Sequence, residues 1–180
     1  ISNPLIEVGD LKAVVSFAKK HGLVSMIDNT FASPINFRPI EHRFDLSLHS
    51  CTKYLNGHAD IVAGAVIGSA AHIEQIKHKL DHLGGTLDPH ACFLLQRGMK
   101  TLALRVARQN ESAFRIASFL QGHASISRVN YPGLESSPFH ARARELFDGY
   151  GGMLSFEIGG GLEDVDRFMR KVKISLIAPS

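Results

Sequence analysis

Two short runs of reactive side chains stand out in this sequence, and an apolar segment precedes each. The first run is DNTF at residues 28–31, and the second is HSCTKY at residues 49–54. The amine of Lys53 can condense with an aldehyde, and the hydroxyl groups of Ser50 and Thr52 can donate hydrogen bonds to a phosphate. The carboxylate of Asp28 can pair with a protonated ring nitrogen. Together these groups suit a phosphorylated aldehyde that carries a cationic ring.

Buried strands are predicted to position both runs. Residues 23–27 and 44–48 are apolar stretches typical of buried strands, and a third lies at 61–67. In open α/β sheets, ligands bind beyond the carboxyl ends of strands, so we expect both runs to face one ligand. Each run also has an ordinary interpretation. An aspartate after a strand commonly forms a turn or caps a helix, and Ser-x-Thr-Lys is a short, common pattern.

Helices are predicted around these strands. Asp10 suits the N-cap of a helix, and the apolar spacing within residues 73–83 indicates an amphipathic one. Asp88 followed by proline is typical of a helix start. This start predicts one long connecting helix over about 88–121, with Gly98 as its weak point.

After that helix, the sequence pattern changes to short strands and a final helix. Strands are predicted at 127–131 and 153–158, and a last helix at 164–172. The alternation of strands and helices favours an α/β fold. We expect residues 1–122 to belong to one domain and residues 123–180 to begin a smaller second one.

Composition excludes several classes of protein. The 180 residues carry a formal net charge of +3, and their lysines and arginines are scattered, which disfavours nucleic-acid binding. No apolar run approaches the ~20 residues that span a bilayer. The two cysteines, Cys51 and Cys92, lie far apart, so we expect free thiols in a reducing compartment, the cytoplasm.

Longer stretches of the chain resemble one enzyme family. DNTFASP at 28–34 and HSCTKYLNGHAD at 49–60 are similar to the signature of the cystathionine γ-synthase family, the Cys/Met-metabolism enzymes that use pyridoxal 5′-phosphate (PLP). Further matches are Asn3-Pro4, RGMKTL at 97–102, YPGL at 131–134, GGMLSF at 151–156 and APS at 178–180. The resemblance covers essentially all 180 residues, in order.

The resemblance implies a fold and a set of site residues. The fold would be the core of the large domain of a fold type I PLP enzyme, plus the beginning of its C-terminal α/β domain. Lys53 would bond covalently to the cofactor and move protons, and Asp28 would keep the ring nitrogen protonated. The other implied contacts are Ser50 and Thr52 with the phosphate, Asn3 with the cofactor's phenolic oxygen and the substrate carboxylate, and Ser180 with that carboxylate.

The resemblance also implies a reaction, with alternatives left open. The full-length enzyme would make or break the Cγ–S bond of cystathionine, as a γ-synthase or a γ-lyase. Methionine γ-lyase and O-acyl-homoserine sulfhydrylase are the alternatives. Several lyases and bacterial synthases have an acid before the carboxylate-binding serine, where this chain has Pro179. The pairs His49/Cys51 and His58/Asp60 contain zinc-type ligands, but the family uses no metal and we expect none.

The ends of the chain suggest a piece of a longer protein. It begins without a methionine and closes on an apolar run at residues 174–178. By the resemblance, a phosphate-binding turn and a ring-stacking tyrosine would precede it, and a carboxylate-binding arginine would follow. A neighbouring subunit would supply a tyrosine and an arginine in a homotetramer, a dimer of dimers. We therefore expect that the isolated chain is a structural fragment without activity.

Overall fold

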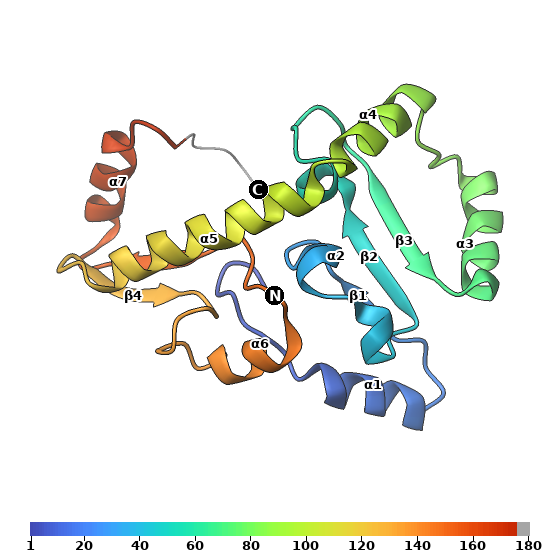
Figure 1. Ribbon diagram of the computed structural model, residues 1–180, viewed down its shortest axis with the longest axis horizontal. Coiled ribbons are helices and arrows are strands. Elements are labelled where there is room, and N and C mark those ends of the chain that lie inside the picture. The colour runs from blue at the N-terminus through green and yellow to red at the C-terminus, as the bar shows by residue number, and fades with distance from the viewer. Residues whose placement is uncertain (176–180) are drawn as a thin grey trace.

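The computed structural model describes residues 1–175 and has a mixed α/β architecture (Figure 1). The helices and strands follow one another as α1 (Leu11–Lys20), β1 (Met26–Asp28), α2 (Ser33–Asn36), β2 (Leu46–Ser50), β3 (Gly64–Gly68), α3 (Ala70–Leu83), α4 (Pro89–Met99), α5 (Leu102–Gln121), β4 (Ile126–Asn130), α6 (His140–Leu146), β5 (Ser155–Ile158) and α7 (Leu162–Lys171). Among these helices, none is long and apolar enough to cross a membrane.

The sheet formed by β1, β2 and β3 positions both reactive runs. Strand β2 lies in the middle, parallel to β1 and antiparallel to β3. Asp28 of β1 pairs with Leu48 of β2, and Ser50 at the end of β2 pairs with Gly64 of β3. Because β1 and β2 run in the same direction, their carboxyl ends meet at one edge of the sheet, as predicted.

Two of the three predicted strands are shorter and more exposed than expected. Strand β1 begins at Met26 instead of Leu23, and Leu23 is 54% exposed. Strand β3 begins at Gly64, and Ile67 within it is 52% exposed. The prediction of buried strands at 23–27 and 61–67 is therefore wrong in extent and in burial. Both are the outer strands of the sheet, so part of their apolar surface stays open.

Capping residues fix the ends of the helices as predicted. The backbone N–H of Ala13 donates to Asp10 Oδ1 at 3.0 Å at the start of α1. Ala91 N–H donates to Asp88 Oδ1 at 3.0 Å at the start of α4. Each cap satisfies a backbone N–H that has no partner within the helix.

The predicted single helix over about 88–121 is wrong, because the structure divides it into α4 and α5. Gly98 lies in the last turn of α4, where a Cβ atom would come 2.4 Å from the backbone oxygen of Asn56. Thr101 follows with φ −107° and ψ 5°, and its hydroxyl donates to the Gly98 carbonyl at 3.2 Å. The helix thus breaks where α4 packs against the segment that follows Lys53.

Helix α5 packs against both halves of the chain. One core lies between α5, the antiparallel pair of β4 and β5, and the segment after β4, and contains the buried residues Ala113, Ala117, Tyr131 and Leu134. A second core joins α5 to the segment after β2 and contains Cys51, Leu55, Leu102 and Val106. A third core joins the N-terminal segment to α6 through Val8, Ala32, Phe37, Ala143, Leu146 and Phe147. Figure 1 shows α5 crossing between the two regions. A domain boundary at residue 122 stays a prediction.

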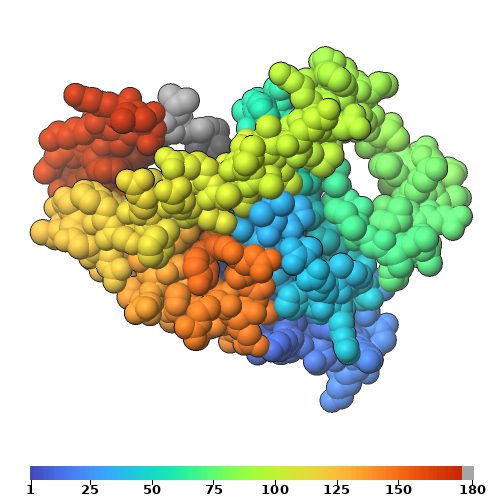
Figure 2. Space-filling view, in the orientation of Figure 1, coloured from blue at the N-terminus to red at the C-terminus, as the bar shows by residue number. Residues whose placement is uncertain are grey.

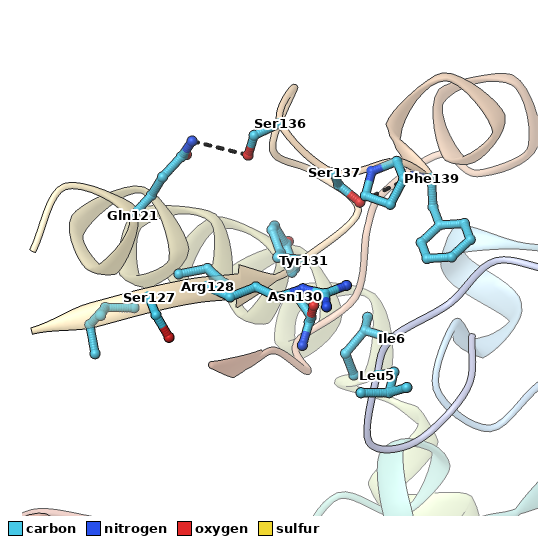
Figure 3. Close-up of a pocket in the computed structure, with 13 residues that line it drawn as sticks. Leu5, Ile6, Gln121, Ser127, Arg128, Asn130, Tyr131, Ser136, Ser137 and Phe139 are labelled. Carbon is cyan, nitrogen blue, oxygen red and sulfur yellow. Dashed lines mark hydrogen bonds between the residues drawn. The ribbon is translucent and has the colours of Figure 1, made fainter. Parts of the chain in front are cut away.

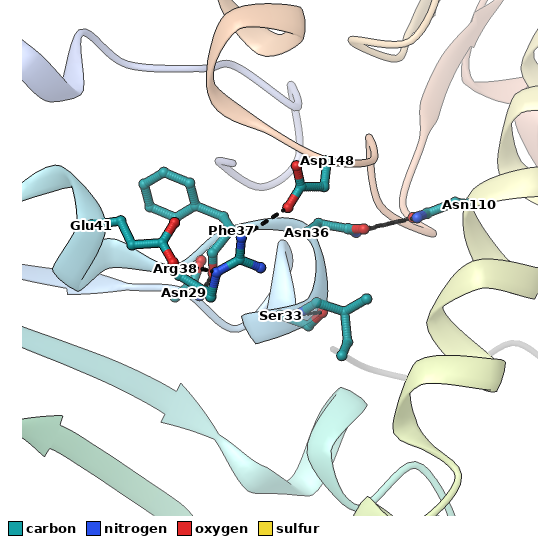
Figure 4. A network of polar contacts seen from close by, with 9 residues as sticks. Asn29, Ser33, Asn36, Phe37, Arg38, Glu41, Asn110 and Asp148 are labelled. Carbon is teal, nitrogen blue, oxygen red and sulfur yellow. Dashed lines mark hydrogen bonds and ion pairs between the residues drawn. The ribbon is translucent and has the colours of Figure 1, made fainter.

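A polar network ties the segment around residue 150 to α5 (Figure 4). The side-chain amides of Asn36 and Asn110 exchange two hydrogen bonds, at 3.0 and 2.8 Å. Asn110 Oδ1 also accepts from the backbone N–H of Gly151 at 3.0 Å. A Cβ atom on Gly149 would come 2.2 Å from Asn110 Nδ2, so only glycine fits there. The network places Gly152 beside the carboxyl edge of the sheet.

Candidate active site

Thr30 joins the two strand ends on which the reactive runs begin. Its backbone N–H donates to Asp28 Oδ1 at 2.9 Å, which is the hydrogen bond of an Asx turn. Its Oγ1 accepts from the backbone N–H of Ser50 at 2.8 Å. Asp28 and Ser50 are therefore held at neighbouring strand ends, as the sequence predicts.

Lys53 lies on a tight turn directly after β2. Cys51–Leu55 form one turn of π-helix, which Asn56 N–H closes by donating to Cys51 O at 3.1 Å. Lys53 itself has φ −90° and ψ −111°, which is far from helical values. Backbone of this kind persists where the surroundings enforce it and is concentrated at functional sites.

The hydroxyl of Thr52 already has partners within the protein. Thr52 Oγ1 accepts from the backbone N–H of Ala63 at 3.0 Å and donates to the Ala63 carbonyl at 3.4 Å. The same carbonyl accepts from Cys51 N–H at 2.8 Å. Thr52 therefore anchors the Lys53 turn to the chain segment before β3, a role that the sequence did not indicate.

A depression of about 610 Å³ opens beside this turn. Its lining comes from the N-terminal segment, the end of β1, the Lys53 turn, α5 and the segment near residue 152. The lining residues are Asn3, Phe31, Thr52, Lys53, Tyr54, Gly57, Ala59, Gln109, Gly152 and Met153. Segments far apart in the sequence thus meet around one lysine.

The structure brings together part of the predicted site. Asn3, Thr52 and Lys53 line the depression. Asp28 and Ser50 lie at the adjacent strand ends, outside the lining. Ser180 falls outside the described residues.

Among the other residues of the lining, Tyr54, Gln109 and Gly152 were given no role at the site by the sequence reasoning. The Tyr54 hydroxyl lies beside Gly152, and burial raises the pKa of this tyrosine. Gln109 Oε1 is buried and has no hydrogen-bond partner among residues 1–175. A buried acceptor without a donor, at the edge of a depression, is suited to a ligand donor. The GGMLSF stretch pointed to Gly152, but nothing in the sequence singled out Gln109.

The inner side of the Lys53 turn is buried. Burial lowers the pKa of His49, and the charge of Asp28 opposes that shift. Cys51 is completely buried, and burial raises the pKa of its thiol. Both groups are therefore in their neutral forms at neutral pH, whereas Lys53 on the same turn is exposed.

A second hollow, of about 250 Å³, lies between β4, the N-terminal segment and the loop before α6 (Figure 3). Gln121 Nε2 donates to Ser136 Oγ at 3.0 Å across its rim. Arg128 is the one charged side chain in its lining, which consists of described residues, and lies 3.9 Å from Glu157. This hollow offers no paired acid, base or nucleophile.

Known proteins resemble the chain throughout its length. Residues 1–180 match the family model described as Cys/Met metabolism PLP-dependent enzyme. The chain is 44% identical to cystathionine gamma-synthase 1, chloroplastic, of Arabidopsis thaliana, over 99% of this chain and 32% of that protein. It is 40% identical to cystathionine gamma-lyase of Bacillus subtilis, over 99% of this chain and 47% of that protein.

A solved structure has the same fold. Cystathionine gamma synthase from Xanthomonas oryzae pv. oryzae, in complex with cystathionine, matches with a TM-score of 0.96 and 42% identity, over 99% of this chain and 46% of that one. The expected fold class, that of fold type I PLP enzymes, is confirmed. The chain spans between about a third and half of the length of these relatives. It belongs to the family of Cys/Met-metabolism PLP-dependent enzymes.

Proposed function

We propose that the full-length protein is a PLP-dependent enzyme that makes or breaks the Cγ–S bond of cystathionine, with Lys53 as the lysine that bonds to the cofactor. One observation carries the proposal. Lys53 has non-helical dihedral angles within a turn that lines a depression of about 610 Å³, next to the strand ends that bear Asp28 and Ser50.

The residues present fit PLP. The amine of Lys53 suits the aldehyde, and the orphaned Gln109 Oε1 marks a place where a ligand donor is needed. The bond from Thr52 Oγ1 to Ala63 O is long, at 3.4 Å, and therefore weak. The Thr52 hydroxyl can turn this proton towards a phosphate while it still accepts from Ala63 N–H.

Each predicted residue has a definite task in this proposal. Bound PLP would supply an electron-accepting ring. Asp28 would keep the ring nitrogen protonated, and Lys53 Nζ would move the Cα proton of the substrate to the cofactor and then take a proton from Cβ, so that the Cγ substituent can leave. Ser50 and Thr52 would hold the phosphate. Asn3, together with Ser180 beyond the described range, would orient the substrate carboxylate.

Identity does not separate synthesis from cleavage, because relatives with both names match at 44% and 40%. A kinetic comparison on the full-length protein can separate these two reactions. One assay follows cleavage of cystathionine, and the other follows replacement of the γ-ester of an activated homoserine by cysteine. Appreciable turnover in either supports the proposal. Negligible turnover in both, with rapid release of methanethiol from methionine, identifies a methionine γ-lyase. If the γ-ester is replaced by sulfide but not by cysteine, the protein is a sulfhydrylase.

The assembly and the compartment follow from the same proposal. We infer a homotetramer, built as a dimer of dimers, because exposed apolar side chains such as Leu104 and Phe119 on α5 suit subunit contacts. Cys51 and Cys92 are free thiols, which suits the reducing cytoplasm. The mass of the full-length protein by light scattering tests the assembly, and cell fractionation tests the compartment. The isolated 180-residue chain is expected to show no turnover.

A further inference from the structure

The guanidinium group of Arg105 binds the backbone just after Lys53. Arg105 lies on α5, and its Nη1 donates to the carbonyl of Tyr54 at 2.8 Å. Its Nη2 donates to the carbonyl of Leu55 at 3.3 Å and to that of Gly98 at 2.8 Å. One side chain therefore joins the Lys53 turn to the end of α4.

Two of these bonds satisfy the carbonyls of Tyr54 and Leu55, which helical geometry leaves without partners, and the third adds to the bonds that Gly98 O accepts from Thr101. The last carbonyls of any helix have no N–H to accept from within it. Tyr54 and Leu55 end the π-helical turn, and Gly98 lies in the last turn of α4. A cation is favoured at such helix ends. Arg105 reaches the end of the π-helical turn and the end of α4 together because its N–H groups are arranged in a planar fork.

Glycines make room for this contact. A Cβ atom on Gly57 would come 1.9 Å from Arg105 Nη1, and Gly57 also has φ +70°, which favours glycine. A Cβ atom on Gly98 would come 2.4 Å from the backbone oxygen of Asn56. The close approach of α4, α5 and the Lys53 turn therefore depends on residues from three separate segments.

A neighbouring arginine shows that this arrangement is not general along α5. Arg108, one turn further on, is exposed and pairs with Glu111 at 2.9 Å. Arg105 forms no ion pair within residues 1–175. Its Nε donates instead to Thr101 Oγ1 at 3.0 Å. All four of its acceptors are neutral, so its donors serve to fix backbone and hydroxyl positions.

We propose that Arg105 is a positioning residue for Lys53, because it fixes the carbonyls that follow this lysine and so sets where Lys53 Nζ lies. The inference rests on the proposed role of Lys53. A displacement of a reacting group by about 1 Å can lower a rate by about 100-fold. Lysine at position 105 would keep the charge but could not span the separate acceptors.

The first test needs neither cofactor nor turnover. Hydrogen exchange of the Asn56 and Gly57 amides, which close the turn by donating to Cys51 O and Lys53 O, is measured on the full-length protein without PLP. We expect exchange at least about tenfold faster in Arg105→Lys. Thr101→Val, which removes the Nε acceptor and the hydroxyl's own bond to Gly98 O but keeps the three bonds from Arg105 to carbonyls, should give a smaller increase in the same direction. Arg108→Lys is the matched control and should leave exchange unchanged.

The second test asks whether the loosened turn affects Lys53. In the PLP-loaded full-length protein, Arg105→Lys should lower kcat for cystathionine about 10- to 100-fold and leave KM within about threefold. Arg108→Lys should change neither constant. Unchanged amide exchange in Arg105→Lys overturns the proposal, and so does faster exchange with unchanged kcat. If Arg105→Lys does not fold, Thr101→Val decides by the same two criteria.

The two proposals fail in different ways. If the parent protein bonds PLP through a lysine other than Lys53, the proposed function is wrong, and the positioning role falls with it even where Arg105 still protects the amides. If PLP bonds to Lys53 but Arg105→Lys behaves like Arg108→Lys, only the positioning role is wrong.

Discussion

The Lys53 turn and helix α3 lie at opposite ends of strand β3 and are held in opposite ways. In the turn, Cys51 and Asn56 are completely buried, and Arg105 binds two carbonyls. In α3 no residue is buried, and Figure 2 shows this helix standing away from the rest of the molecule. Close packing is thus concentrated around the lysine that we propose as the cofactor lysine, and α3 contributes little to its placement.

The largest effect should come from removing the lysine itself. Lys53→Ala in the full-length protein should lower turnover at least about 1000-fold, because it deletes both the covalent bond and the proton carrier. Lys100→Ala, at the exposed end of α4, is the control and should stay within about threefold of the parent. Comparable losses of turnover in both variants would contradict the proposed role of Lys53.

The next largest effect concerns the strand end beside the turn. Asp28→Asn replaces a carboxylate by a neutral amide that cannot hold a ring proton. Breaking such an ion pair costs about 3–5 kcal/mol when it is buried, and each ~1.4 kcal/mol is tenfold in rate. We expect kcat to fall about 100-fold or more, with a smaller loss of PLP affinity. Turnover within threefold of the parent would refute this role.

The packing around the turn should be sensitive to a single methyl group. Gly98→Ala would gain about 1 kcal/mol of helix propensity, but overpacking against backbone costs about 1–3 kcal/mol. The contact, 2.4 Å from Asn56 O, cannot be relieved by a side-chain rotation. We expect a net loss of stability in thermal unfolding of the full-length protein. Gly122→Ala, whose Cβ would lie 3.8 Å from its nearest neighbour, is the matched control and should be nearly neutral.

A pH effect should appear behind the turn. Burial lowers the pKa of His49 below its usual 6.5. The unfolded chain therefore binds this proton more readily, and the free energy of unfolding should decrease as the pH falls below about 6.5. His49→Gln should weaken this dependence, which urea unfolding of the full-length protein at several pH values can measure. An unchanged slope would show that His49 is not the group responsible.

The smallest effect is expected on α3. Leu83 is 84% exposed, and Leu83→Ser should change stability by no more than about 0.5 kcal/mol. A loss above about 1 kcal/mol in the full-length protein would show that another part of it covers α3. The contrast between the two ends of β3 would then hold for this chain but not for the whole enzyme.

Local signals in the sequence predicted local structure well. Asp10 and Asp88 cap helices because the side chain that caps and the backbone it binds are three residues apart. Asp28 and Ser50 lie at adjacent strand ends because parallel strands align their carboxyl ends. The sequence marked Gly98 as the weak point of a single helix but did not predict the division into α4 and α5, where Gly98 lies close to Asn56, 42 positions earlier in the chain.

The same reason explains what was missed at the site. Arg105 is one of several arginines on a polar-looking helix, and its role depends on carbonyls about 50 residues away. Gln109 became notable only because its oxygen is buried without a partner. The hydroxyl of Thr52 was assigned to a phosphate from its residue type, and its hydrogen bonds with the backbone of Ala63, 11 residues away, could not be predicted from the sequence.

The most direct test of the account is chemical mapping of the cofactor-bonding lysine. The full-length protein is loaded with PLP, reduced with borohydride, digested and analysed by mass spectrometry. The account predicts one labelled peptide, with the pyridoxyl group on Lys53, and no label there in Lys53→Ala. A label on Lys100 or on any lysine other than Lys53, in the folded and loaded protein, would contradict it.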